Sequence, residues 1–237
     1  MALPRMQTPL YNVTIPSTKK EVQFRPFLVK EEKALLLAQQ SEDPKVMVNT
    51  LKSIIADCVQ EDIDVDNLAI FDFEYLFTQI RAKSVGEIVE LLFLCDTCTV
   101  DEAKAPVKMD ISKFTVNIPE THSNKIELFD DVGVVMKYPS IDTLEKIDQA
   151  TSGNVDSIFD VVAGCMDYVY NTEEVFYTKD QTKEEVIEFL ESLTQQQFSK
   201  IEAYFEAMPK MSQSIEYDCP VCGKHHNKKL EGLQSFF

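Results

Sequence analysis

The sequence predicts an α+β fold in which helical segments accompany a discontinuous zinc ribbon and an N-terminal β arm. The apolar residues change their period along the chain, from strand-like alternation to helical spacing and back again. Two Cys-x-x-Cys pairs each follow a predicted strand. An apolar content of 44% in 237 residues is enough for a hydrophobic core. We expect these parts to pack into one compact unit.

Residues 1–30 are predicted to form the β arm, because YNVTI and EVQF alternate on either side of the turn-like PSTKK. Residues 31–84 are predicted to be helical. Strong helix formers fill residues 31–40. Asp43 followed by Pro44 is a favourable start for a second helix. A third helix is expected over about residues 72–83.

Residues 85–139 are predicted to hold the first half of the ribbon together with β hairpins. The β-branched and apolar run EIVELLFLC indicates a strand that leads into Cys95. Alternating runs follow near residues 107–111 and 114–118. IELFD and GVVMKY then flank a short turn and predict a hairpin.

Residues 140–209 are predicted to be helical again, beginning with a helix over about 155–170. Two further helices start with capping boxes, Thr182 with Glu185 and Thr194 with Gln197. Residues 210–237 are predicted to form the second half of the ribbon and a C-terminal tail.

The strongest chemical signal is the set of four cysteines Cys95, Cys98, Cys219 and Cys222. Two thiolates placed two residues apart can be aimed at one tetrahedral ion by a tight turn, and Gly223 would supply the positive φ that such a turn often needs. The 120 residues between the pairs exceed the usual interval of about 15 to 20. We therefore expect a structural zinc that clips the middle of the chain to its end.

Other interpretations of the cysteines remain open at this point. A redox pair would sit at a helix N-terminus, whereas both pairs follow predicted strands. Unmetallated thiols are a second alternative. His225 and His226 lie close enough to replace a thiolate or to donate to one, or they simply occupy the strand after the turn. Four sulfurs would leave no open position for a reactant, which indicates a structural role and not an enzyme.

The remaining candidates have ordinary explanations. Cys58 and Cys165 lie on the apolar faces of predicted helices, where a buried thiol is common. His122 is expected to be solvated in a loop. The acidic run EDIDVDN lacks the Gly and Glu that a calcium loop needs, so we expect a solvated turn.

The charge of the chain limits its partners. A net charge of −17 makes non-specific binding to nucleic acid unfavourable, although KHHNKK is locally basic and keeps a zinc-ribbon regulator of transcription as the competing hypothesis. No apolar run is long enough for a membrane span, and we expect a reducing cytoplasm. The apolar YNVTIP and LQSFF either pack on their own domain or anchor another subunit.

Two stretches carry a family resemblance: ALPRMQTPLYNVTIPSTKKEVQFRPFLVKEEKALLLA near the start and CPVCGKHHNKKLEGLQSFF at the end. They resemble the T4-type bacteriophage baseplate hub assembly family. The resemblance implies a non-enzymatic phage tail protein that builds the baseplate hub in the host cytoplasm through contacts with other hub or tail proteins. It leaves open whether the protein is a chaperone-like factor or a virion subunit. Only the four cysteines are carried over, as metal ligands.

Overall fold

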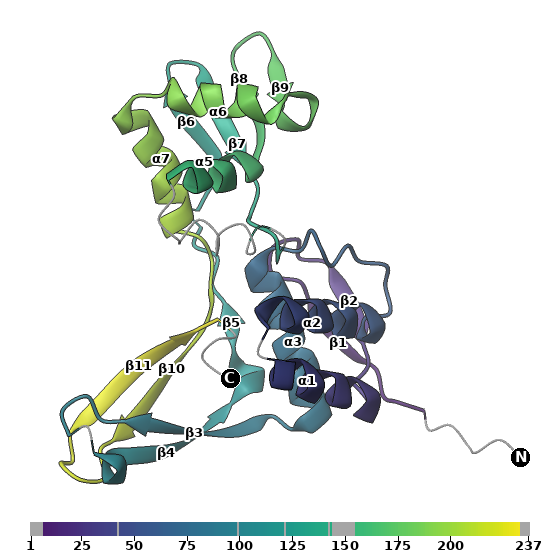
Figure 1. Ribbon diagram of the computed structural model, residues 1–237, viewed down its shortest axis with the longest axis vertical. Helices are drawn as coiled ribbons and strands as arrows, with labels where there is room; N and C mark the ends of the chain where they lie inside the picture. The colour runs from purple at the N-terminus through teal and green to yellow at the C-terminus, as the bar shows by residue number, and fades with distance from the viewer. Residues whose placement is uncertain are drawn as a thin grey trace, which may run out of the picture. The chain divides into compact units, whose positions relative to one another are not determined.

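The computed structural model describes residues 7–41, 43–98, 100–120, 122–141, 143 and 155–232, with side chains in the last range from residue 158 onward. These residues confirm the predicted α+β class (Figure 1). None of the described helices is both long and apolar enough to cross a membrane. The predicted aromatic tail, residues 233–237, lies outside the described residues.

The chain divides into two compact units, whereas one was predicted from the sequence. Unit 1 extends to Val65, continues over Phe71–Asn117 and ends with the segment that starts at Lys210. Unit 2 comprises Asp66–Ile70 and Ile118–Pro209. Most of unit 2 is therefore inserted into unit 1.

The insertion begins and ends at two strands that pair with each other. The chain leaves unit 1 after β5 (Thr115–Val116) and returns at β10 (Met211–Asp218). These strands are antiparallel, with Met211 opposite Val116. Both connections to this inserted segment therefore start from one sheet of unit 1.

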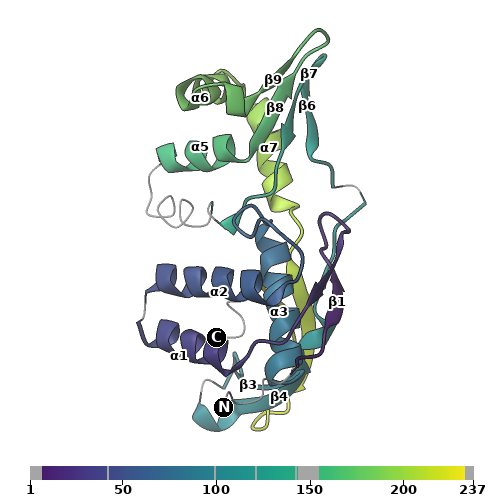
Figure 2. The same cartoon turned by 90° about the vertical axis from the view of Figure 1, so that its right-hand side faces the viewer.

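Unit 1 starts with a β hairpin and three helices: β1 (Tyr11–Thr14), β2 (Glu21–Phe24), α1 (Val29–Ser41), α2 (Pro44–Cys58) and α3 (Ile70–Val85). The hairpin packs on its own unit, beside α3 (Figure 2). Its alternate residues Val13, Val22 and Phe24 are buried. Ser17 in the turn donates its backbone N–H, over 3.0 Å, and its hydroxyl to the buried Asp72. Of the two alternatives left open for the arm, packing on its own domain is therefore the one observed, because its apolar residues lie in the core of unit 1.

The three predicted helices of this region are present, with ends that differ by a few residues. Asp43 caps α2 by accepting a hydrogen bond from the backbone N–H of Lys45 over 2.9 Å, and Pro44 is the first helical residue, as predicted. The face that α2 buries includes Leu51, Ile54 and Ile55.

Two antiparallel hairpins complete unit 1. One pairs β3 (Ile88–Leu94) with β4 (Lys104–Asp110), and the other pairs β10 with β11 (His225–Glu231). Side chains alternate between the two faces of a strand, and those on the inner faces of both hairpins share one core. They are Val89, Leu91, Phe93, Ala105, Met109, Ile215, Tyr217 and Leu230. The rings of Phe93 and Tyr217 stack with centroids 5.4 Å apart. This packing brings the ends of the two hairpins together.

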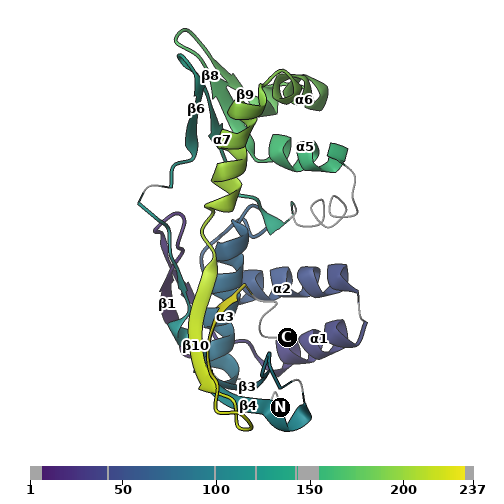
Figure 3. The same ribbon diagram turned by 90° about the vertical axis from the view of Figure 1, so that its left-hand side faces the viewer.

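Unit 2 contains a four-stranded antiparallel sheet and helices. The strands lie in the order β6 (Lys125–Phe129), β7 (Val132–Met136), β8 (Met166–Tyr170) and β9 (Val175–Tyr177). The helices are α5 (Val155–Gly164), α6 (Lys183–Glu191) and α7 (Gln195–Glu206). Both predicted capping boxes are present at the starts of α6 and α7. Helices α5 and α6 lie on the same side of the sheet (Figures 2 and 3).

The helix predicted over residues 155–170 is wrong in its second half. The helix ends at Gly164, and Met166–Tyr170 forms strand β8 instead. The spacing of Met166 and Val169 fits a helical face, but β8 pairs on both sides, with β7 and β9. These ladders, together with the β propensity of Tyr and Val, outweigh the local pattern. The hairpin of β6 and β7 consequently belongs with the segment after it, and not with the ribbon.

Candidate metal centre

The first cysteine pair lies in a tight turn after β3. The strand ends at Leu94, and Cys95 follows at once with a fully buried side chain. The backbone N–H of Thr97 points at the Cys95 Sγ, 3.4 Å away. The chain then reaches β4 through a short 3₁₀ helix, Asp101–Ala103, whose buried Ala103 packs against the cysteines.

The second pair repeats this arrangement after β10. The Cys219 Sγ accepts backbone N–H groups from Val221 at 3.4 Å and from Cys222 at 3.5 Å. The turn is closed by a hydrogen bond from the Gly223 N–H to the Cys219 carbonyl, 2.9 Å long. Gly223 has a φ of +69°, which confirms the reason predicted for a glycine at this position.

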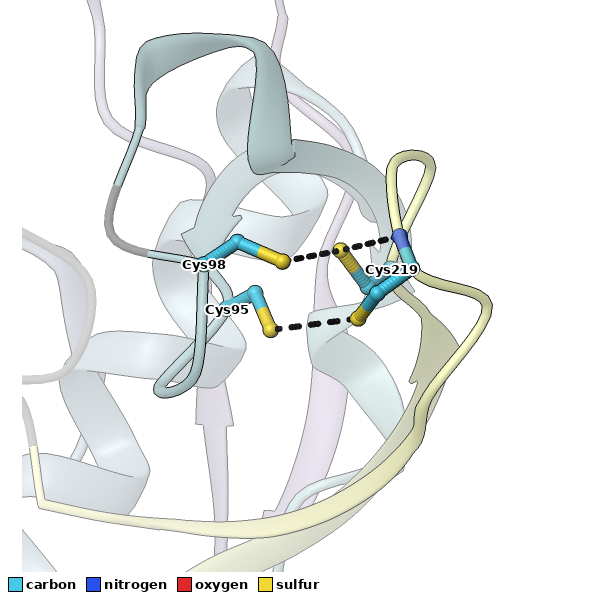
Figure 4. Close-up of side chains that lie close together, drawn as sticks. Cys95, Cys98 and Cys219 are labelled. Atoms are coloured by element: carbon cyan, nitrogen blue, oxygen red, sulfur yellow. Dashed lines mark hydrogen bonds between the residues drawn. The ribbon is translucent and has the colours of Figure 1, made fainter.

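The four sulfurs converge at one point, although 120 residues separate the two pairs. Their Sγ atoms all lie within 4.8 Å of one another, with Cys95 3.9 Å from Cys222 and Cys98 3.8 Å from Cys219 (Figure 4). Four sulfurs at about 2.3 Å from a tetrahedral ion lie about 3.8 Å apart. The spacing therefore fits a metal ion bound by four thiolates.

Polar contacts also join the two turns. The Lys224 ammonium donates to the Thr97 hydroxyl over 3.0 Å, and Lys228 pairs with Asp96 over 3.0 Å. The Tyr217 hydroxyl donates to the Leu94 carbonyl over 3.4 Å. Hydrogen bonds and an ion pair thus join the two turns in addition to the contacts between the sulfurs.

The electrostatics of the cluster favour a cation. Backbone N–H groups of Cys98 and then Thr97 lower the pKa of the Cys95 thiol to about 5. Backbone N–H groups, first that of Cys222, also lower the pKa of Cys219. The pKa of Cys98 is raised to about 12, chiefly because its proton is shared with the Cys222 sulfur. Four sulfurs this close cannot all be anionic alone, and a divalent ion would take the place of the shared protons.

The two histidines after the second pair have different surroundings. His225 is exposed and its Nδ1 lies 2.8 Å from an Asp218 carboxylate oxygen. His226 is buried, stacks on Tyr217 with centroids 4.9 Å apart, and makes a minor contribution to the lowered pKa of Cys95. Among the described residues, the group that could hold an ion consists of the four cysteines, without either histidine. The sequence could not predict which of the two adjacent histidines is buried. The alternation of side chains along β11 decides that His226 faces inward.

The other candidate residues do not join a site. Cys58 and Cys165 are buried, as predicted, and Cys165 lies in the apolar core of unit 2. Within the described residues, the four cysteines form the group of His, Cys, Asp and Glu side chains able to hold a metal, so the acidic turn near residue 64 provides none.

The prediction that His122 is solvated is wrong. Its ring stacks on Tyr204 and Tyr138, with centroids 5.0 and 5.6 Å away, and its Nε2 atom is buried. Burial lowers the pKa of His122. The local sequence ETHSN indicates a loop. The imidazole is nevertheless covered by a tyrosine of α7, which lies in a distant part of the chain.

Comparisons with curated proteins and with solved structures gave no significant match. A comparison with protein families gave one, to the family described as T4 bacteriophage base plate protein, over residues 8–237. The match covers nearly the whole chain, including both cysteine pairs and the inserted unit. The chain therefore belongs to the T4 bacteriophage base plate protein family, which indicates a structural protein of the phage tail.

Proposed function

We propose that this protein is a non-enzymatic component of the baseplate hub, or a factor that assembles it, and that it works through protein contacts. In this proposal Cys95, Cys98, Cys219 and Cys222 bind one structural zinc ion. The four-sulfur geometry is the observation that carries the proposal, because it accounts for the most distinctive residues of the chain without any reaction. The protein would act in the host cytoplasm during assembly and contact other tail proteins.

Zinc is the metal that this donor set favours. Soft thiolates in a tetrahedral set of four select zinc or iron over the hard cations magnesium and calcium. With all four positions taken by sulfur, no water can bind for catalysis. Native mass spectrometry of protein purified without chelator should find one zinc per chain. Protein that carries iron, or no metal at all, would contradict this part.

The competing hypothesis, a nucleic-acid-binding zinc ribbon, rests on the basic stretch that became β11. Its cations already have acidic partners: Lys228 lies 3.0 Å from Asp96 and Lys229 lies 2.9 Å from Glu231. Few positive charges remain free for phosphates. A titration against duplex and single-stranded DNA at low salt tests this directly, because phosphate binding must weaken steeply as salt rises. We expect no binding.

The hub assignment is tested by capture from infected cells. Tagged protein, expressed during infection, should co-purify with hub components in preference to proteins of the tail tube or sheath. Co-purification with host transcription proteins instead would favour the competing hypothesis. Capture of no phage protein at any stage of infection would contradict a role in assembly.

A further inference from the structure

Most of the negative charge of the chain lies in unit 2. Asp66–Ile70 and Ile118–Pro209 hold 20 acidic and six basic residues, whereas the rest of the chain holds 20 acidic and 17 basic residues. Unit 2 therefore carries a net −14 of the total −17. A surface so strongly of one sign attracts basic partners and opposes association with copies of itself.

Unit 2 also has an apolar pocket of about 310 Å³ between the β8 and β9 hairpin and helix α6. Its walls include Met166 and Val169 from β8, Phe176 from β9, and Val186 and Phe189 from α6. Phe176 is still 40% exposed. A half-exposed aromatic ring beside an apolar pocket is typical of a surface that binds a partner.

The pocket lies along an open edge of the sheet. Among the described strands, β9 pairs only with β8. All three of its residues are exposed and apolar or aromatic, namely Val175, Phe176 and Tyr177. Such an edge offers unpaired N–H and C=O groups to an incoming strand. Proteins commonly bind extended peptides by pairing at an edge of this kind, with side chains entering adjacent pockets.

Acidic side chains dominate the elements that form the pocket. Glu173 and Glu174 are exposed in the turn before β9, and Glu184, Glu185 and Glu188 are exposed on α6. The nearby cations are already engaged. Lys179 lies over the Tyr177 ring, 5.2 Å from its centroid, and Lys183 lies 2.7 Å from an Asp160 oxygen.

We propose that β9 and this pocket, together the β9 groove, bind an extended segment of another tail protein in which apolar residues alternate with Lys or Arg. The segment adds a strand to β9, places its apolar side chains in the pocket and directs its basic side chains to the glutamates. The period of two along a strand allows both contacts at once. This inference specifies the partner of the proposed function and therefore rests on it.

The test combines capture with zero-length carbodiimide cross-linking, which joins carboxylates to lysines in contact. The tagged full chain is incubated with proteins from infected cells, cross-linked and analysed by mass spectrometry. We expect cross-links from Glu184 or Glu188 to a lysine-containing segment of a tail protein. Phe176→Asp should reduce this product about tenfold or more, since loss of a buried anchor commonly costs over 1.4 kcal/mol.

Matched controls separate the groove from general effects. Ile158→Asp makes the same kind of change at an apolar residue that is 51% exposed on α5, outside the pocket. The double reversal Glu184→Lys with Glu188→Lys is compared with Glu202→Lys and Glu206→Lys on α7, which change the net charge equally. Phe176→Asp should lose the cross-linked product, and both groove variants should lose capture of the tail protein, which does not depend on the replaced carboxylates as cross-linking sites. The control variants should keep both. Circular dichroism melting checks that each variant is folded.

The outcomes distinguish the two proposals. If the wild type captures tail proteins and the Phe176 and α6 variants capture them equally well, the β9 groove is not the docking site, while the proposed function stands. Cross-links from the groove to a second copy of this chain would also overturn the inference. If the wild type captures no tail protein, the proposed function itself fails.

Discussion

Removing one sulfur from the cysteine cluster should weaken the fold and metal binding together. In the Cys219→Ser variant, the ion would lose one of its four ligands, and its link between the two hairpins would weaken. Cross-linking Cys98 to Cys219 closes a loop of about 120 residues in the unfolded chain. Loop-closure entropy for this length is about 5 kcal/mol.

The loop-closure contribution to stability is smaller if unit 2 stays folded while unit 1 unfolds. Its two ends, next to the paired β5 and β10, would remain close together, and the loop then shortens to about 26 residues, from Cys98 to Val116 and from Met211 to Cys219. The corresponding stabilisation is about 3.5 kcal/mol. At 2 to 4 °C per kcal/mol, these two values predict that removal of the metal lowers the melting temperature by roughly 7 to 20 °C.

Calorimetry with and without a zinc chelator measures this shift. We expect the chelator to destabilise the wild type by this amount and to have little further effect on Cys219→Ser. Cys58→Ala is the matched control, because Cys58 is a buried thiol of the same unit outside the cluster. It should keep its zinc. A wild type that loses its zinc to the chelator but melts at the same temperature would refute the structural role of the ion.

Three further predictions concern the fold. Gly133→Ala should cost about 1 to 3 kcal/mol, because a Cβ there would meet the Tyr170 hydroxyl and lie 2.6 Å from the Ile126 carbonyl oxygen. Urea unfolding should show no such loss for Gly164→Ala, where a Cβ meets nothing within 4 Å. Asp72→Ala should cost about 1 to 3 kcal/mol by orphaning the Ser17 N–H, and a smaller loss for Asp72→Asn, which keeps an acceptor, would separate this from a packing effect. His122 has a pKa below its usual 6.5 in the folded state, so the unfolded chain binds the proton more tightly and stability falls as pH drops below about 6.5. In His122→Phe this part of the pH dependence of unfolding should disappear, and an unchanged pH profile would show that His122 is not the group responsible.

Much of the secondary structure could be predicted because it depends on neighbouring residues. A capping box needs only Thr194 and Gln197, three positions apart, and both boxes are present. The cysteine turns are equally local, since the spacing of Cys219 and Cys222 and the glycine after them define the turn. Strand β8 could not be predicted, because the residues that decide its state lie on β7 and β9.

The sequence by itself determined the α+β class, the two sulfur-bearing turns and the acidic character of the chain, because each depends on composition or on residues within one turn of one another. Only the tertiary structure decided that a second unit is inserted between the two turns, that His226 is buried, and that the Nε2 atom of His122 is covered. The physical reason is that long-range pairing, such as that of β5 with β10, gains its energy from packing and ladder hydrogen bonds between distant segments. No local pattern encodes those partners.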